Sequence, residues 1–166
     1  YVLSLDDAEG APLLNVFGGK ITTYRRLAEA ALEKIGRHFP KAGAPWTARS
    51  PLPGGDFPVD GVDDLVAGLR RDYPFLTERW ARRLVRAYGT EAREVLGDAT
   101  KVGDLGRDFG ATLTEAELRW LMAREYARTA EDVVWRRSKL GLRLTEAQIA
   151  EIDAFMSGER LAQAAE

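Results

Sequence analysis

Apolar and polar residues follow two different spacings along this chain, and each spacing predicts a different kind of element. Two short apolar runs, 1–5 and 13–17, are typical of strands, and the second is apolar enough to predict burial inside a sheet. Apolar residues then recur every three or four positions, which predicts an amphipathic helix over 23–38. Thr22 or Thr23 is the expected N-cap of that helix.

From residue 61 onward the pattern is almost entirely helical. The apolar spacing and the start and stop residues predict helices over 61–72, 77–88, 90–96, 114–126, 129–141 and 145–157. Thr77 is an expected N-cap. Thr114 with Glu117, and Thr145 with Gln148, have the spacing of capping boxes. Several amphipathic helices with short connections predict a compact all-α bundle.

The domain organisation that we expect has four parts. Residues 1–40 form a fragment of an α/β domain, with two strands, a Gly-Gly-Lys turn and a helix. Residues 41–60 are rich in Pro, Gly and Ala and are expected to form a linker. Residues 61–158 form the all-α domain, and Gly158 is expected to end its last helix before a tail, 159–166. The predicted fold class is therefore mainly α.

Nothing in the sequence predicts a complete catalytic site. The first strand pattern starts at Tyr1, and an isolated pair of strands is marginal in water, so we expect the rest of the sheet to lie upstream. A G-x-G-x-x-G motif after a strand, which would cradle a pyrophosphate, does not occur. The one histidine, His38, is expected to lie exposed at a helix end, without a partner for general-base catalysis.

Composition and charge exclude several classes of function. Of the 166 residues, 45% are hydrophobic and 30% are charged, as in globular proteins, and no apolar run approaches the length of a membrane span. There is no cysteine, so disulfides and thiolate metal sites are excluded. The net charge of −2 does not favour nucleic acid as a partner.

The stretch from Asn15 to Arg26 carries the most specific candidate chemistry. A strand that passes through Gly18-Gly19 into a helix leaves backbone N–H groups unpaired at the positive end of the helix dipole. Lys20 adds a full positive charge there, and glycines allow a ligand to approach the main chain closely. This geometry suits a phosphate, a carboxylate or the pyrimidine edge of a flavin. The alternative is a tight turn in which Lys20 is simply solvated.

The segment Val16 to Arg25, VFGGKITTYR, closely resembles the flavin-facing segment of FAD-dependent, quinone-linked glycerol-3-phosphate dehydrogenases and of the related glycerophosphate oxidases. Further motifs that resemble the C-terminal region of this family follow in the same order: Leu52 to Gly55, Arg71 to Leu76, Asp104 to Gly110 and Thr129 to Gly141. The resemblance covers essentially the whole chain.

The resemblance implies a role for the chain within a larger enzyme. Such an enzyme oxidises glycerol 3-phosphate to dihydroxyacetone phosphate with hydride transfer to FAD. Residues 1–40 would be the end of its FAD and substrate domain, and 61–158 its C-terminal cap. Gly19, Lys20, Ile21 and Thr22 would contact the cofactor, and Lys20 also the substrate anion. The fragment alone is expected to be inactive and to bind no FAD.

The resemblance also implies partners and a location. The partners are the upstream FAD-binding half of the same chain and glycerol 3-phosphate, with membrane quinone as the expected acceptor for a dehydrogenase. The expected location is cytoplasmic, with a peripheral position on the inner face of the membrane compatible with quinone as acceptor. A homodimer is compatible with the sequence. The residues that distinguish a dehydrogenase from an oxidase are expected mostly upstream.

Clustered arginines support an alternative of a different class. Arg79, Arg82, Arg83 and Arg86 share a helical face, and a second cluster comprises Arg136, Arg137, Lys139 and Arg143. The alternative is a helical interaction module whose arginine face binds a membrane surface, nucleic acid or a partner subunit. A solvated face with scattered carboxylate pairs is the expected arrangement for the first cluster. Structural pairing with Glu125, Glu131 or Asp132 is expected for the second.

Paired aspartates are not expected to bind a metal. Asp63 with Asp64, and Asp104 with Asp108, lack the glycine spacing and the terminal glutamate of a calcium loop. Helix capping and surface charge are the expected roles of these carboxylates.

Overall fold

A computed structural model describes residues 1–163 of the chain. The chain divides into two compact units, Tyr1–Pro51 and Leu52–Glu166. We call them the N-terminal unit and the helical unit and describe each by itself. No helix within the described range combines the length and the apolar character that crossing a bilayer requires.

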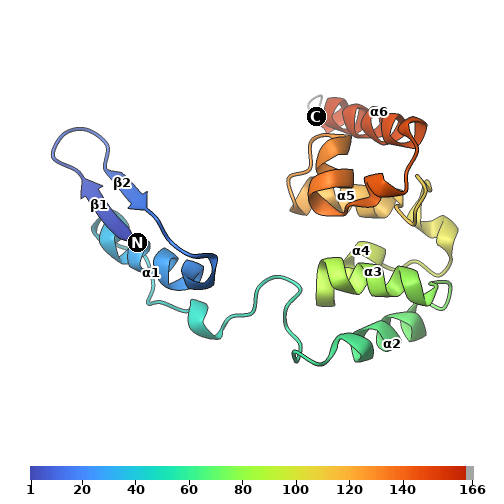
Figure 1. Cartoon of the computed structure of the whole chain (residues 1–166), viewed down its shortest axis with the longest axis horizontal. Helices are drawn as coiled ribbons and strands as arrows, with labels where there is room; N and C mark the ends of the chain where they lie inside the picture. The colour runs from blue at the N-terminus through green and yellow to red at the C-terminus, as the bar shows by residue number, and fades with distance from the viewer. Residues whose placement is uncertain (164–166) are drawn as a thin grey trace. The chain divides into compact units, whose positions relative to one another are not determined.

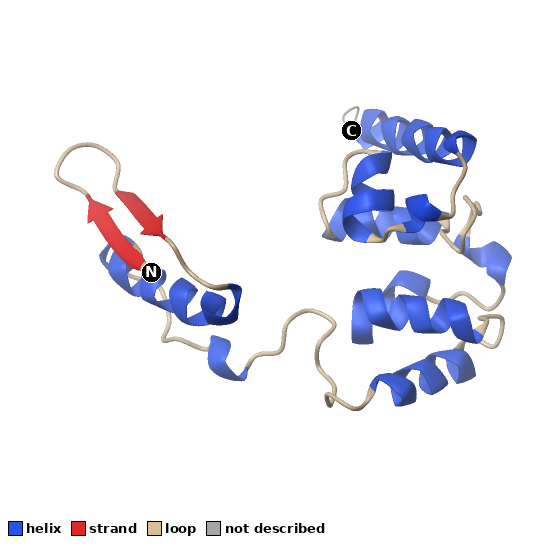
Figure 2. Cartoon of the chain, in the orientation of Figure 1, coloured by secondary structure: helices blue, strands red, loops and turns tan. Residues whose placement is uncertain are grey.

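The N-terminal unit is built on an antiparallel hairpin. Strands β1 (Val2–Asp6) and β2 (Leu13–Phe17) pair in a register that sets Val2 opposite Phe17 and Asp6 opposite Leu13 (Figure 2). Both predicted strands are therefore confirmed. The hairpin contacts α1 (Tyr24–Ile35), which the 3-10 turn Ile21–Thr23 precedes (Figure 1).

Neither strand is buried within this chain, so the prediction that residues 13–17 lie in a sheet interior is wrong for the chain by itself. Leu13 and Phe17 each expose 58% of their surface, and α1 contains no buried residue. Two strands and one helix leave much of the apolar surface of the hairpin without cover.

Within the described residues the helical unit contains five α-helices, which confirms the predicted all-α architecture. They are α2 (Val62–Asp72), α3 (Glu78–Tyr88), α4 (Ala92–Leu96), α5 (Glu115–Arg124) and α6 (Glu146–Gln163). Between α5 and α6 lie a π-helical segment, Asp132–Arg137, and a 3-10 turn, Leu140–Leu142. Residues 129–141 are thus not the regular α-helix that the spacing predicts.

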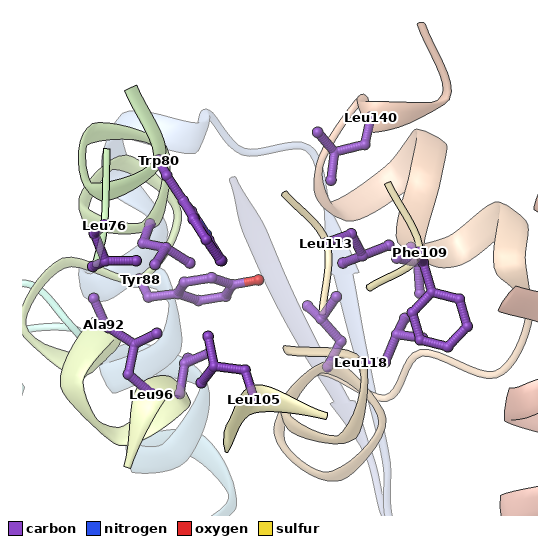
Figure 3. Close-up of a cluster of buried hydrophobic side chains, with 14 of the residues drawn as sticks. Leu76, Trp80, Tyr88, Ala92, Leu96, Leu105, Phe109, Leu113, Leu118 and Leu140 are labelled. Carbon is purple, nitrogen blue, oxygen red and sulfur yellow. The ribbon is translucent and has the colours of Figure 1, made fainter. Parts of the chain in front are cut away.

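One apolar core holds the helical unit together. Its members come from all five helices and from the loop that carries Phe109 and Leu113, whose side chains expose 1% and 0% of their surface. Figure 3 shows side chains of α3 and α4, such as Trp80 and Leu96, together with Leu118 of α5. The core therefore fixes the positions of these helices relative to one another.

The capping predictions have different outcomes. The Thr77 hydroxyl accepts a hydrogen bond from the Trp80 amide at 3.3 Å, and Thr145 and Gln148 form the predicted capping box. The box predicted at Thr114 is wrong, because the Thr114 side chain makes no capping hydrogen bond.

The prediction that Gly158 ends the last helix is also wrong, because α6 continues to Gln163. Helical hydrogen bonding tolerates a single glycine at a modest cost in free energy. Residues 164–166 of the predicted tail lie outside the described part of the chain.

The second half of the predicted linker packs on the helical unit. The unit boundary falls between Pro51 and Leu52, inside the predicted linker 41–60. The Gly54 carbonyl accepts a hydrogen bond from the Thr90 amide at 3.0 Å. A Cβ at Gly54 would lie 2.2 Å from the Tyr88 carbonyl oxygen, so only glycine allows this approach.

Candidate functional site

The turn between β2 and α1 positions the residues that the sequence predicts as cofactor ligands. Gly18 and Gly19 have φ angles of +72° and +127°, which reverse the chain as it leaves β2. Lys20 is extended, with φ −114° and ψ 144°, and Ile21 begins the 3-10 turn. The turn residues Gly18 to Thr22 are exposed on one edge of the N-terminal unit.

Backbone donors are free along this turn. Within residues 1–163, no oxygen accepts a hydrogen bond from the amides of Gly19, Lys20, Ile21 or Thr22. The first amide to be paired is that of Thr23, which donates to the Lys20 carbonyl at 2.9 Å. Thr23 is the N-cap residue of α1, as predicted, but its hydroxyl donates to the same carbonyl and makes no capping hydrogen bond. Consecutive free amides before a helix attract an anion or a polarised carbonyl oxygen.

No side chain covers the main chain at the two glycines of the turn. A Cβ built on Gly18 would meet nothing within 4 Å, and one on Gly19 would approach only the Leu27 side chain, at 3.3 Å. Both glycines have positive φ angles, a conformation that other residues adopt at a cost. The main chain is therefore bare on this edge, as close approach of a flavin ring would require.

Polar contacts of α1 stabilise the unit behind the turn. The Arg25 guanidinium donates to the Glu29 carboxylate at 2.9 Å, and the Thr47 hydroxyl donates to the same carboxylate. The hydrogen bond from Thr47, and then the charge of Arg25, lower the pKa of Glu29. His38 lies exposed in the 3-10 turn after α1, as predicted, with its Nε2 3.9 Å from the Asp7 carboxylate.

The N-terminal unit exposes many large apolar side chains. The large hydrophobic residues with at least 47% exposure are Tyr1, Val2, Leu13, Val16, Phe17, Ile21, Tyr24, Leu32, Phe39 and Trp46. Ile21, within the turn itself, is 86% exposed. Apolar surface gathered on one small unit marks a region that another protein segment or a ligand covers.

The helical unit contains a second candidate site, a groove with a volume of about 770 Å³. We call it the arginine groove. Its lining comprises Arg79, Arg82, Arg83, Arg86, Ala87, Ala111, Thr112, Arg137, Ser138, Lys139, Leu140, Leu142 and Arg143. The two basic clusters, which the sequence presents as separate, thus meet along one groove between α3 and the turns that follow the π-helical segment.

The predicted structural pairing holds for part of the second cluster. Arg136 lies 2.8 Å from the Asp132 carboxylate and 3.5 Å from that of Glu131, and Arg137 lies 3.5 Å from that of Glu125. Desolvation raises the pKa of Glu125, while the charge of Arg137 opposes this shift. Asp132 also accepts hydrogen bonds from the backbone amides of Arg128 and Thr129, so its role is structural, as the expected pairing with the second cluster implies.

The first cluster differs from the predicted solvated face at Arg83. Its guanidinium donates to both carboxylate oxygens of Glu117, at 2.7 and 2.6 Å, and Glu117 is only 1% exposed. The Tyr88 hydroxyl donates to the same carboxylate at 2.7 Å. Burial alone would lower the pKa of Arg83, but the hydrogen bonds and charge of Glu117 outweigh burial and raise it. Burial, and then the charge of Glu117, raise the pKa of Tyr88.

Sequence reasoning missed this buried pair because its partners are 34 residues apart. The spacing of Thr114 and Glu117 indicated a local cap, whereas the glutamate reaches across to α3 instead. The one local signal was the position of Glu117, which precedes Leu118 on the apolar face of α5.

Comparison with known proteins identifies the family. Residues 45–160 match the sequence profile of the C-terminal domain of alpha-glycerophosphate oxidase. The aerobic glycerol-3-phosphate dehydrogenase of Escherichia coli is 48% identical over 157 residues, which is 94% of this chain and 31% of that protein. The D-erythritol 1-phosphate dehydrogenase of Brucella abortus is 45% identical over 90% of this chain and 30% of its own length. The glycerol-3-phosphate dehydrogenase of Pseudomonas aeruginosa is 42% identical over 96% of this chain and 31% of its own length.

The chain spans about a third of the length of these relatives. The matching profile is that of a C-terminal domain, and it begins at residue 45, so it includes the whole helical unit up to residue 160 and only the last residues of the N-terminal unit. The turn at Lys20 precedes residue 45, so the profile does not include it. The matches to the relatives, which cover 90% or more of the chain, do include it. The chain therefore belongs to the glycerol-3-phosphate dehydrogenase and glycerophosphate oxidase family, as a C-terminal segment.

Proposed function

We propose that this chain is the C-terminal part of an FAD-dependent enzyme that oxidises glycerol 3-phosphate to dihydroxyacetone phosphate. Relatives that are 48% and 42% identical carry the name glycerol-3-phosphate dehydrogenase. The observation that carries the proposal is the row of unpaired amides from Gly19 to Thr22, exposed on a turn without side chains on its outer edge. Such a row suits a cofactor that gains negative charge in the reaction.

Bound FAD would supply the hydride acceptor. The residues of this chain would act on it electrostatically. The amides of Gly19, Lys20, Ile21 and Thr22 would donate hydrogen bonds at the carbonyl edge of the ring, and the N-terminus of the following helix would favour negative charge there. Because that charge grows on reduction, these contacts would stabilise the product side of hydride transfer more than the substrate side.

Lys20 is the residue that we assign to the substrate. The names of the relatives contain glycerol 3-phosphate and D-erythritol 1-phosphate, and both compounds are phosphate esters of polyols. A residue that binds the shared phosphate must be positively charged and accessible. Lys20 is exposed beside the free amides, and no carboxylate within residues 1–163 forms an ion pair with it.

The upstream half of the same protein is the partner that we assign to the N-terminal unit. The hairpin exposes Leu13 and Phe17 by 58% each, so further strands and the FAD-binding domain would cover this surface.

The proposal also includes a cytoplasmic location, with a peripheral position on the inner face of the membrane and quinone as acceptor. It further includes a homodimer. The isolated chain would carry no catalytic site of its own.

The test is the variant Lys20→Ala in the complete enzyme. Loss of one hydrogen bond to a charged group should lower kcat/KM for glycerol 3-phosphate roughly 10- to 100-fold. Flavin content and the flavin reduction potential should be measured alongside, because a lower potential would show that Lys20 also acts on the reduced cofactor. Lys41→Ala, an exposed lysine away from the turn, is the matched control. Unchanged kcat/KM and potential in Lys20→Ala would remove this residue from the site.

The isolated chain provides a second test. Purified without the upstream half, it should show no stoichiometric flavin absorbance and no oxidation of glycerol 3-phosphate. Bound flavin at one equivalent would contradict the division of the site between the two halves.

A further inference from the structure

The arginine groove concentrates positive charge on a protein whose net charge is −2. Seven of its lining residues are cationic, and no carboxylate lines it. Four come from α3 and three from the segment around the turn Leu140–Leu142. Placing like charges side by side costs electrostatic free energy. A groove that is lined by several cations and by no carboxylate therefore indicates an anionic ligand.

Three of the seven cations are already paired. Arg82 lies 2.8 Å from the Asp63 carboxylate, Arg83 pairs with Glu117 at 2.6 Å, and Arg137 lies 3.5 Å from Glu125. The other four, which form no ion pair within residues 1–163, are Arg79, Arg86, Lys139 and Arg143. These four side chains are exposed and free to bind a ligand.

The groove wall is fixed by its paired arginine. Arg83 donates to the Thr112 carbonyl at 2.8 Å and to the Thr112 hydroxyl at 2.9 Å, while its other contacts tie it to buried Glu117. Ala111, Thr112 and Lys139 all line the groove, and their φ angles are +50°, +70° and +59°. Positive φ at residues other than glycine costs free energy and is often found at binding sites.

The size and lining of the groove indicate the class of ligand. A volume of about 770 Å³ is within the range of small-molecule sites, roughly 300–1,000 Å³. Arginine forks match phosphate oxygens with two parallel hydrogen bonds. Leu142, which is 77% exposed, and Ala87 add an apolar part to the same groove.

We propose that the arginine groove binds a phosphate monoester through Arg79, Arg86, Lys139 and Arg143. The ester is either a soluble phosphorylated small molecule or phosphatidic acid, a lipid whose headgroup is itself a phosphate monoester. This site lies in the helical unit and does not depend on Lys20. It therefore stands apart from the oxidation that we propose above.

Titration calorimetry on the 166-residue chain tests the proposal with two probes. The first is inorganic phosphate, and the second is phosphatidylcholine vesicles that contain phosphatidic acid. Saturable binding that is lost at high salt is expected for at least one probe. Binding of phosphate without preference for the vesicles identifies a soluble ligand, and much tighter binding of the vesicles identifies a lipid headgroup.

Matched variants locate the binding. Arg86→Gln with Arg143→Gln should weaken it at least about tenfold, because each lost charge-assisted hydrogen bond is worth that much or more. Arg49→Gln with Arg70→Gln, two exposed arginines outside the groove, should leave the affinity unchanged. Thermal unfolding without ligand checks that all variants are folded.

The absence of saturable binding of both probes would overturn the proposal, as would an equal loss of affinity in the groove and control variants. So would tight binding of a polyglutamate peptide with none of either phosphate probe. The last result would assign the groove to an acidic protein segment. Loss of binding in Lys20→Ala alone would place the phosphate at the turn of the N-terminal unit and would also contradict the groove site.

Discussion

At the scale of single residues, the structure depends on one buried ionic cluster. Glu117 is 1% exposed and accepts hydrogen bonds from Arg83 and Tyr88, which joins α5 to α3. A buried carboxylate that loses its partner keeps the cost of desolvation without the compensating attraction. The cluster should therefore be far more sensitive to substitution than the exposed ion pairs around it.

Arg83→Met should destabilise the helical unit by about 3–5 kcal/mol, because it leaves Glu117 buried without its charged partner. Arg82→Met, one position earlier on the same helix, removes only exposed pairs with Asp63 and Glu78 and should cost at most about 1 kcal/mol. Urea unfolding followed by tryptophan fluorescence measures both. Equal effects of the two substitutions would show that the buried pair contributes no more than a surface pair.

Replacing both buried partners extends this test. Arg83→Met with Glu117→Leu should be less destabilising than Arg83→Met alone, because no unpaired charge remains in the core. A double variant at least as unstable as the single one would mean that packing, and not the unpaired charge, dominates the loss.

Asp132 should make the stability depend on acid pH. Hydrogen bonds from the Arg128 and Thr129 amides lower the pKa of Asp132 from 3.8 to about 2. A depressed folded pKa contributes stability that is fully present above the unfolded value and is lost as the pH falls through the folded one. The contribution should therefore decline between about pH 4 and pH 2. Urea midpoints across this range should show a smaller decline for Asp132→Asn, and an identical decline would contradict the assignment.

At the scale of elements, local signals predicted most of the fold and long-range contacts accounted for the errors. Both strands, the cap at Thr77 and the box at Thr145 depend on neighbouring residues, so spacing alone identifies them. Glu117 does not form the predicted cap with Thr114 and instead accepts a hydrogen bond from Arg83 on another helix. The exposed Gly-Gly-Lys turn was predictable as a motif, whereas the arginine groove was not, because two clusters more than 40 residues apart in the sequence line it.

The segment Leu52–Gly55 is another case in which local sequence signals did not predict a long-range contact. Its Pro and Gly content is typical of a linker, but Gly54 contacts the end of α3. A Cβ at Gly89 would lie 1.8 Å from the Gly54 carbonyl oxygen, and both glycines have positive φ angles. Composition cannot distinguish a glycine that gives flexibility from one that allows two backbones to touch.

Gly89→Ala should therefore destabilise the helical unit by at least about 2 kcal/mol, through both the positive φ angle and the steric overlap. Gly103→Ala is the matched control, since its Cβ would meet nothing within 4 Å and its φ angle is not positive. The unfolding free energy in urea measures both variants. A loss at Gly89 no larger than that at Gly103 would show that the Gly54 segment can move aside.

At the scale of the whole molecule, the two units differ in how complete they are. The helical unit has its own core, and the N-terminal unit has no buried residue along α1 and exposes most of its large apolar side chains. This difference agrees with a chain that spans about a third of its relatives. The helical unit should fold without the upstream half, whereas we propose that the hairpin and its free amides function only together with that half.

Hydrogen exchange at the turn tests this account most directly. In the complete enzyme, the amides of Gly19, Lys20, Ile21 and Thr22 should exchange much more slowly with FAD bound than after its removal, because the cofactor would accept their hydrogen bonds. Amides in α6 should exchange at the same rate in both states. Equal exchange at the turn with and without FAD would contradict the claim that these amides serve the cofactor.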